Sequence, residues 1–208
     1  MARLTGAKCR VCRRLGAKLF LKGQRCDSPK CPIEKENHPP GQHGAKRMRL
    51  TEYGVHLREV QRAKKMYGVM HRQFRRYFQE AVARPGNSGE VLVQTLERRL
   101  DNVVYRLHMG FSRAHARQII RHGHIRVNGR KTTIPSYPVE AGDVIEPARR
   151  EKSQKIVKEA LAARKDAPLP SWLKLAEDPP QGKVTALPTG AELQMPLEPQ
   201  LIVEYMSR

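Results

Sequence analysis

Two close pairs of cysteines are the residues of this chain best suited to chemistry. Cys9 and Cys12 are separated by two residues, Cys26 and Cys31 by four, and the chain has no other cysteine. Two such pairs across a short loop are typical of a four-thiolate metal site. We expect Zn²⁺, because closed thiolate sites of this kind hold structural zinc; an iron-sulfur cluster is the alternative. Disulfides are the other use of such pairs, and they persist in oxidising compartments.

Basic residues crowd the segment that carries the cysteines. Residues 1–44 contain few large apolar side chains, so a bound metal would supply much of the free energy that folds them. Arginine forks and lysine ammonium groups around such a loop favour phosphate binding. We predict RNA contacts by Arg10, Arg13, Arg14, Lys18, Lys22 and Arg25.

A second basic group begins at Ser112, which can cap a helix whose amino end attracts phosphate. Arg113, Arg117 and Arg121 follow at four-residue spacing, which places them along one helix face. We predict that this face and the hairpin after it bind RNA, with His124 or Asn128 hydrogen bonding to sugars or bases. The predicted residues are Ser112, Arg113, Arg117, Arg121, His122, His124, Arg126, Asn128, Arg130 and Lys131, with Arg47, Arg49, Arg72 and Arg76 as further contacts.

The net charge also points to a polyanionic partner. Forty Lys and Arg residues against twenty Asp and Glu give +20 at pH 7 and a pI near 10.4. No apolar run is long enough for a membrane span and no start resembles a signal peptide, so we expect a cytoplasmic protein with no membrane partner. Residues 159–208 hold five basic and seven acidic residues, so this tail is expected to pack on the protein.

The hydrophobic periodicity predicts an α+β protein. A mostly helical domain over 45–95 follows the metal-stabilised arm 1–44, and its aromatics Phe74, Tyr77 and Phe78 are expected in the core. A helix-helix-strand module is expected over 96–164, with one continuous helix from Leu92 to Leu107, a helix from Ser112 to Gly123 and an Asn128-Gly129 hairpin turn. Seven prolines after residue 164 exclude long regular structure there, so the tail 165–208 is expected to wrap.

Several stretches share a pattern with one known family. They are Leu100-Asp101-Asn102-Val103-Val104-Tyr105-Arg106-Leu107, Ala116-Arg117-Gln118, His122-Gly123-His124-Ile125-Arg126-Val127-Asn128-Gly129 and Ile134-Pro135-Ser136-Tyr137. They resemble the RNA-binding module named after the fourth small-subunit ribosomal protein. Pro39-Pro40-Gly41-Gln42-His43-Gly44 and the ending Leu201-Ile202-Val203-Glu204-Tyr205 extend the resemblance to that protein family over nearly the whole chain. Where the family pattern has Gly-Phe-Ala-Ser, this chain has His108-Met109-Gly110-Phe111.

The resemblance implies a structural role in the ribosome. Members of the family bind 16S rRNA directly, nucleate assembly of the small subunit body and influence decoding accuracy. They sit beside the fifth small-subunit ribosomal protein and near the channel through which messenger RNA enters, and some repress translation of their own messenger. Their RNA-binding module is inserted in a helical domain, so the segment 165–208 is expected to return to residues 45–95.

Two other functions fit parts of the sequence. The same module occurs in pseudouridine synthases, and Arg99-Leu100-Asp101 resembles the surroundings of their catalytic aspartate. Asp101 lies within an apolar helical stripe, however, where an ion pair with a neighbouring arginine is the simpler interpretation, and no nucleophile pair or phosphate loop is present. A zinc-finger DNA-binding regulator is the second, but this sequence lacks the Cys pair followed by a His pair that such a finger requires. We therefore expect no enzymatic activity and no small-molecule substrate.

Overall fold

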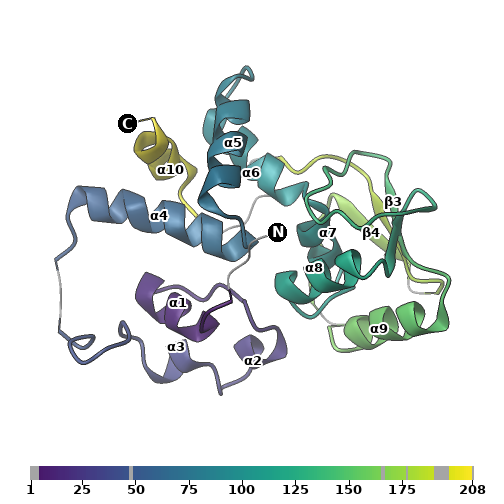
Figure 1. Ribbon diagram of the computed structural model, residues 1–208, viewed down its shortest axis with the longest axis horizontal. Coiled ribbons are helices and arrows are strands. Elements are labelled where there is room, and N and C mark those ends of the chain that lie inside the picture. Colours follow the sequence, from purple (N-terminus) through teal and green to yellow (C-terminus); the bar gives the residue numbers. More distant parts are fainter. Residues whose placement is uncertain (1–4, 47–48, 165–166, 177, 190–196, 208) are drawn as a thin grey trace. The chain divides into compact units, whose positions relative to one another are not determined.

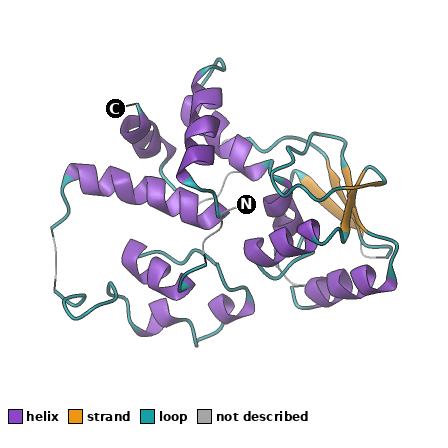
Figure 2. Cartoon of the chain, in the orientation of Figure 1, coloured by secondary structure: helices purple, strands orange, loops and turns teal. Residues whose placement is uncertain are grey.

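The computed structural model describes residues 5–46, 49–164, 167–176, 178–189 and 197–207 (Figure 1). The chain forms two compact units, unit 1 from residues 1–93 with 194–208 and unit 2 from residues 94–193. The helices are α1 (Lys8–Leu15), α2 (Gln24–Asp27), α3 (Pro32–Lys35), α4 (Glu52–Tyr67), α5 (His71–Val82), α6 (Ser88–Glu97), α7 (Leu100–Arg106), α8 (Arg113–Arg121), α9 (Glu151–Ala162) and α10 (Pro199–Met206). The strands are β1 (Ile125–Val127), β2 (Arg130–Lys131), β3 (Val144–Pro147), β4 (Leu173–Ala176) and β5 (Gln181–Val184). The predicted α+β class is confirmed (Figure 2).

Unit 1 is organised by α4, which packs against α10 from the other end of the chain. Thr51 caps α4 by accepting a hydrogen bond from the Gly54 amide, and Gly68 ends it in the left-handed conformation. Ile202 of α10 is 1% exposed. A hydrogen bond of 3.1 Å joins the Tyr53 and Tyr205 hydroxyls across the two helices. The apolar segment around Ile202 therefore packs on the helical unit, as its composition predicted.

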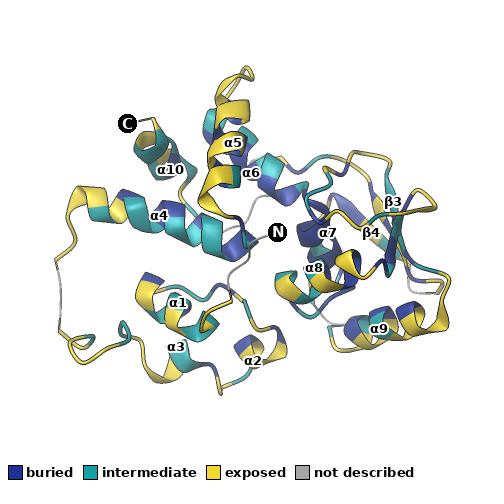
Figure 3. Cartoon of the chain, viewed as in Figure 1, coloured by how far each residue is buried: buried dark blue, intermediate teal, exposed yellow. Residues whose placement is uncertain are grey.

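Helix α5 buries one aromatic face. Phe74 is fully buried, and Tyr77 and Phe78 are less than one-tenth exposed. Their assignment to the core, in preference to base stacking, is confirmed. The basic residues of this helix face outward, since Arg72, Arg75 and Arg76 are exposed (Figure 3).

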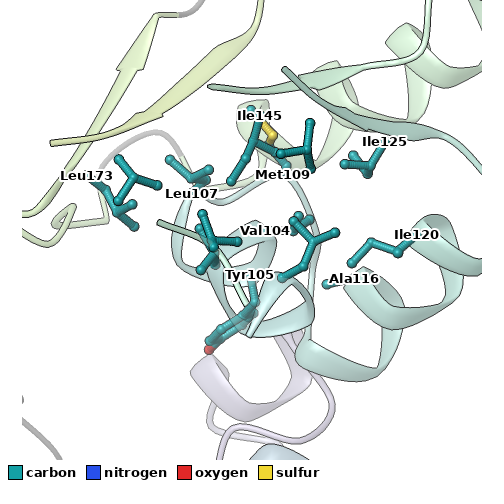
Figure 4. Packing of buried hydrophobic residues seen from close by; sticks show 14 of the residues in the cluster. Val104, Tyr105, Leu107, Met109, Ala116, Ile120, Ile125, Ile145 and Leu173 are labelled. Atoms are coloured by element: carbon teal, nitrogen blue, oxygen red, sulfur yellow. The ribbon is translucent and has the colours of Figure 1, made fainter. Parts of the chain in front are cut away.

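Unit 2 contains one antiparallel sheet with strand order β2-β1-β3-β5-β4. The Asn128-Gly129 turn joins β1 to β2 as predicted, with both residues at positive φ. Side chains from α7, α8 and the sheet form one core, including Val104, Ile120 and Ile145 (Figure 4). Gly182 of β5 is required by this packing, because a Cβ there would lie 2.4 Å from Leu107 Cδ1.

The single helix predicted from Leu92 to Leu107 is wrong. The helix is interrupted between α6 and α7, where the backbone of Arg99 is extended and forms an isolated β-bridge with Pro138. The Leu100 amide donates to the Tyr137 carbonyl at 2.9 Å, which replaces a helical hydrogen bond with a long-range one. The five apolar residues of the predicted stripe are nevertheless all buried: Leu92, Leu96, Leu100, Val103 and Leu107.

The tail also differs from the prediction. We expected residues 165–208 to complete the helical domain, but β5 pairs with β3 and β4 pairs with β5, so both strands extend the sheet of unit 2. Of the described tail residues, only the segment 197–207, which contains α10, belongs to unit 1. Prolines flank these four-residue strands and do not interrupt them. The proline-rich segment therefore contains regular structure, but only in short strands. Among the described residues, no helix has the length and apolar character needed to cross a membrane.

Candidate nucleic-acid interface

A buried polar network fixes α8 against α7. Glu97 is 1% exposed and accepts two hydrogen bonds from Arg106, at 3.1 and 3.0 Å, and one from Asn102 at 2.8 Å. The Asn102 oxygen in turn accepts from Arg113 Nε at 2.7 Å. Arg113 also lies over the ring of Tyr105, 4.6 Å from its centroid. The first arginine of α8 is thus held in place by partners on α7.

Asp101 is the centre of a second ion-pair group. Arg99 forms a bidentate contact with it at 3.1 and 2.8 Å, and Arg117 Nη1 lies 3.5 Å from its carboxylate. Arg99 and Asp101 are both buried. The interpretation of Asp101 as an ion-pair partner is therefore confirmed, and its carboxylate is committed to two guanidinium groups.

These contacts divide the predicted arginine face of α8. Arg113 and Arg117 are partly buried and bound to α7, whereas Arg121 is exposed. Ser112 caps the helix by accepting from the His115 amide at 3.2 Å, as predicted. Among the three arginines, Arg121 presents its charge most openly to solvent.

Basic side chains gather around His124 where α8, the β1–β2 hairpin and α9 meet. We call His122, His124, Lys131, Arg150 and Lys152 the His124 cluster. Burial lowers the pKa of His124, and the charges of the other four members lower it further. His124 Nδ1 lies 2.9 Å from the Ser153 hydroxyl, which fixes its ring on α9. The other four side chains are exposed and form no ion pair within the described residues.

Sequence reasoning found three members of this cluster and missed two. Arg150 and Lys152 stand at the start of α9, about twenty residues after the hairpin. The signal was the basic run Arg149-Arg150 immediately before α9. Its proximity to His124 depends on the pairing of β3 with β1, which brings the start of α9 beside the hairpin.

The hairpin residues are partly engaged within the protein. The Asn128 side-chain amide donates to Asp143 at 2.8 Å and accepts from the Val144 backbone at 2.8 Å, so Asn128 holds the hairpin, and its contact with RNA stays a prediction. Arg126 donates to the Gly129 carbonyl and lies 3.6 Å from Glu146. Arg130 is exposed in the strand that follows the turn.

The basic residues predicted in unit 1 fall into two groups. Arg13 pairs with Glu36 at 2.9 Å, Lys18 with Glu34 at 2.6 Å and Arg76 with Glu80 at 3.6 Å. The remaining predicted residues in the described part of this unit are exposed: Arg10, Arg14, Lys22, Arg25, Arg49 and Arg72. Arg47 lies outside the described residues.

All four cysteines are free thiols that line one small pocket between α1, α2 and α3. Burial raises the pKa of Cys12 and Cys26, and the charges of the neighbouring thiols raise it further. The Lys22 amide donates to Cys26 Sγ at 3.3 Å. In the described part of the chain, no group of three or more His, Cys, Asp or Glu side chains is arranged to hold a metal ion, so the structure does not show the predicted metal-stabilised arm.

Comparison with known proteins decides the family. A family model described as the ribosomal protein S4/S9 N-terminal domain matches residues 3–97, and an S4 domain model matches residues 98–145. The chain is 54% identical to small ribosomal subunit protein uS4A of Symbiobacterium thermophilum over the whole length of both chains. It is 53% identical to uS4 of Dictyoglomus turgidum and 50% identical to uS4 of Pelotomaculum thermopropionicum, again over the full length of each.

The chain belongs to the uS4 family. The S4 domain match begins at residue 98, beside the break between α6 and α7, and it ends within β3. The region matched by the S4 domain model therefore contains α7, α8 and the hairpin, together with the side chains of these elements that form the buried networks. The Arg150 and Lys152 side chains of the His124 cluster lie just beyond it.

Proposed function

We propose that this chain is a structural constituent of the small ribosomal subunit and binds 16S rRNA directly. The observation that carries the proposal is about 50% sequence identity to uS4 proteins over the full length, with the His124 cluster at the edge of the S4 domain, where the other four members form no ion pair among the described residues. Exposed cations free of ion pairs suit the phosphate backbone of a polyanion. A ribosomal role makes the protein cytoplasmic and structural, without a reaction of its own.

The protein binds RNA through basic side chains whose positions are set by contacts within the folded chain. The networks around Glu97 and Asp101 fix α8 on α7, and the Ser153 contact fixes His124 on α9. Because these contacts already hold the elements together in the unbound chain, less conformational freedom is lost when phosphates reach the cluster. The Arg121, Lys131, Arg150 and Lys152 side chains supply the charge, and salt weakens the complex because each neutralised phosphate releases counterions.

A binding experiment with transcribed 16S rRNA tests the proposal. Removing three charges of the His124 cluster, as K131Q/R150Q/K152Q, should lower affinity by at least about tenfold and reduce the slope of log affinity against log salt by about 2. Arg150→Gln and Lys155→Gln provide a matched pair, since both remove one exposed charge at or near α9 and only Arg150 belongs to the cluster. Equal binding by wild type and the triple variant would exclude the cluster as the interface. Uridines of the bound RNA should remain chemically unchanged, which distinguishes this role from pseudouridine synthesis.

We also propose that Cys9, Cys12, Cys26 and Cys31 hold a structural Zn²⁺, with an iron-sulfur cluster as the alternative. The support is that no disulfide links the four cysteines, that they line one pocket, and that they belong to a segment with little apolar core. Backbone donation to Cys26 Sγ suits a thiolate ligand. Bound zinc would neutralise the thiolates and tie α1, α2 and α3 together.

The family resemblance extends the proposal to further roles. These are nucleation of subunit assembly, contact with the fifth small-subunit ribosomal protein and with messenger RNA near its path into the subunit, an influence on decoding accuracy, and repression of the chain's own messenger. Arg49 and Arg72 of unit 1 are two exposed basic residues, outside the arm and the S4 domain, that were predicted from the sequence and are available for such contacts.

A further inference from the structure

The sheet of unit 2 places like charges directly opposite each other in two of its strand pairs. Lys174 of β4 is the register partner of Lys183 of β5. Arg126 of β1 is the register partner of Lys131 of β2. Like charges directly opposite across antiparallel strands repel and destabilise the sheet. Each pair therefore costs stability in the isolated protein.

Register places all four cations on one face. Lys183 is also opposite Val144 of β3, and Glu146, two residues further along β3, is opposite Arg126. Residues opposite each other share a face, and so do residues two apart on one strand. We call Arg126, Lys131, Lys174 and Lys183 the basic sheet face. The alternate residues of β5, Gly182 and Val184, are buried on the other side.

Little negative charge compensates this face. Glu146 lies 3.6 Å from Arg126. Lys131, Lys174 and Lys183 are exposed and form no ion pair in the parts of the chain that the structure describes. The nearby acid Asp178 lies 3.7 Å from Lys158 of α9. Among the residues that the structure describes, the lysine pair of β4 and β5 thus has no carboxylate partner, although it belongs to the least basic part of the chain.

We propose that the basic sheet face binds the phosphate backbone of RNA, as a second contact surface formed by the tail strands. This rests on the proposed function, because Lys131 belongs to both the His124 cluster and the basic sheet face. The face therefore continues the proposed rRNA surface across the sheet to β4. Neighbouring strands lie about 4.8 Å apart, so the cations form two closely spaced pairs, Arg126 with Lys131 and Lys183 with Lys174, on either side of β3. Two such pairs on one face fit the repeated charges of a phosphodiester chain, and lysine ammonium groups bind phosphate as point charges.

The experiment uses the full chain with substitutions K174Q, K183Q and both together. Removing the like-charge repulsion should raise the melting temperature at low salt by about 1–3 °C. The same double variant should bind transcribed 16S rRNA about three- to tenfold more weakly, with a salt slope lower by about 1–2. K174R/K183R should restore binding, and Lys155→Gln should leave it unchanged. The combination of higher stability with weaker RNA binding distinguishes a binding surface from a structural one.

Two outcomes would overturn the inference. In the first, K174Q/K183Q binds rRNA with wild-type affinity and salt slope while K131Q/R150Q/K152Q loses binding, which leaves the proposed function standing and removes the tail strands from the interface. In the second, the double variant binds naked rRNA normally but fails to enter reconstituted subunits, which assigns the lysines to an acidic protein partner. Failure of the wild-type chain to bind rRNA would instead refute the proposed function. Trp172, buried in the core of unit 2, reports by fluorescence whether each variant is folded.

Discussion

Arg113 donates a hydrogen bond of 2.7 Å to the side-chain oxygen of Asn102 and thereby joins the first turn of α8 to α7. The arginine was expected to face RNA, but its Nε is committed to a buried amide. Asn102 itself donates to the backbone carbonyl and the carboxylate of Glu97. One buried side chain thus connects three helices of the chain.

Replacing Asn102 with alanine should destabilise unit 2 by about 2–3 kcal/mol. The substitution removes the hydrogen bonds that Asn102 makes to Arg113 Nε and to the Glu97 carboxylate, and hydrogen bonds to charged groups contribute about 1.5–3 kcal/mol each. Urea unfolding followed by Trp172 fluorescence measures the effect. Gln118→Ala, on the exposed side of α8, is the control and should change stability by less than about 0.5 kcal/mol. A change equally small for Asn102→Ala would show that the network carries no stability.

Glycine should be preferred over alanine at position 108. His108 follows α7 with φ 59°, and the Met109 amide donates to the Val104 carbonyl at 3.1 Å, as in a left-handed helix end. Both substitutions remove the imidazole, but only glycine relieves the backbone strain. His108→Gly should therefore be more stable than His108→Ala by about 1 kcal/mol, measured by the same urea titration. The reverse order would refute the strain argument.

Unit 2 should lose stability when the pH falls from 7.5 to 5.5. Burial lowers the pKa of His108, His115 and His124 below that of an unfolded histidine, near 6.5. The unfolded chain therefore binds more protons than the folded chain in this range, and stability present above pH 6.5 is lost as the pH falls through the folded pKa values. Urea midpoints at several pH values provide the measurement. His115→Gln should make the dependence shallower, and an unchanged slope would contradict the assignment of His115.

Zinc should copurify with the chain at about one ion per molecule, in accordance with the four-thiolate proposal. Cys26→Ser should lower the metal content and the helical circular dichroism signal of the amino-terminal segment, because a coreless segment depends on its metal. His38→Ala, close in sequence but not a proposed ligand, should retain the metal. Elemental analysis separates zinc from iron, and a metal-free wild-type chain that keeps its helical signal would refute the site.

Local features of unit 2 could be predicted from the sequence. Ser112 caps α8 and Asn128-Gly129 forms the hairpin, since each depends on residues within a few positions. The break at Arg99 could not be predicted, because the apolar stripe continues through it and the bridge to Pro138 is a long-range contact. β4 and β5 could not be predicted from the sequence for the same reason, because they depend on long-range pairing. Four-residue strands between prolines become recognisable only through the pairing of β5 with β3 and of β4 with β5.

The candidate site shows a similar division. The spacing of Arg113, Arg117 and Arg121 correctly places them on one helix, but spacing cannot show that two of them bind α7. Lys174 and Lys183 lie in a segment of negative net charge, so composition argued against them. Their proximity follows from the β4–β5 register alone.

The interleaving of the two units has a consequence for the newborn chain. Helix α4 is synthesised about 140 residues before α10, and the sheet lacks two strands until residues 173–184 have left the exit tunnel. During translation the Arg121 and Lys131 side chains emerge before either unit can close its hydrophobic core. At elongation rates of about 5–20 residues per second, several seconds separate these events. The nascent chain is therefore a polycation with exposed apolar side chains. Early binding by chaperones or by nascent ribosomal RNA would protect it from aggregation.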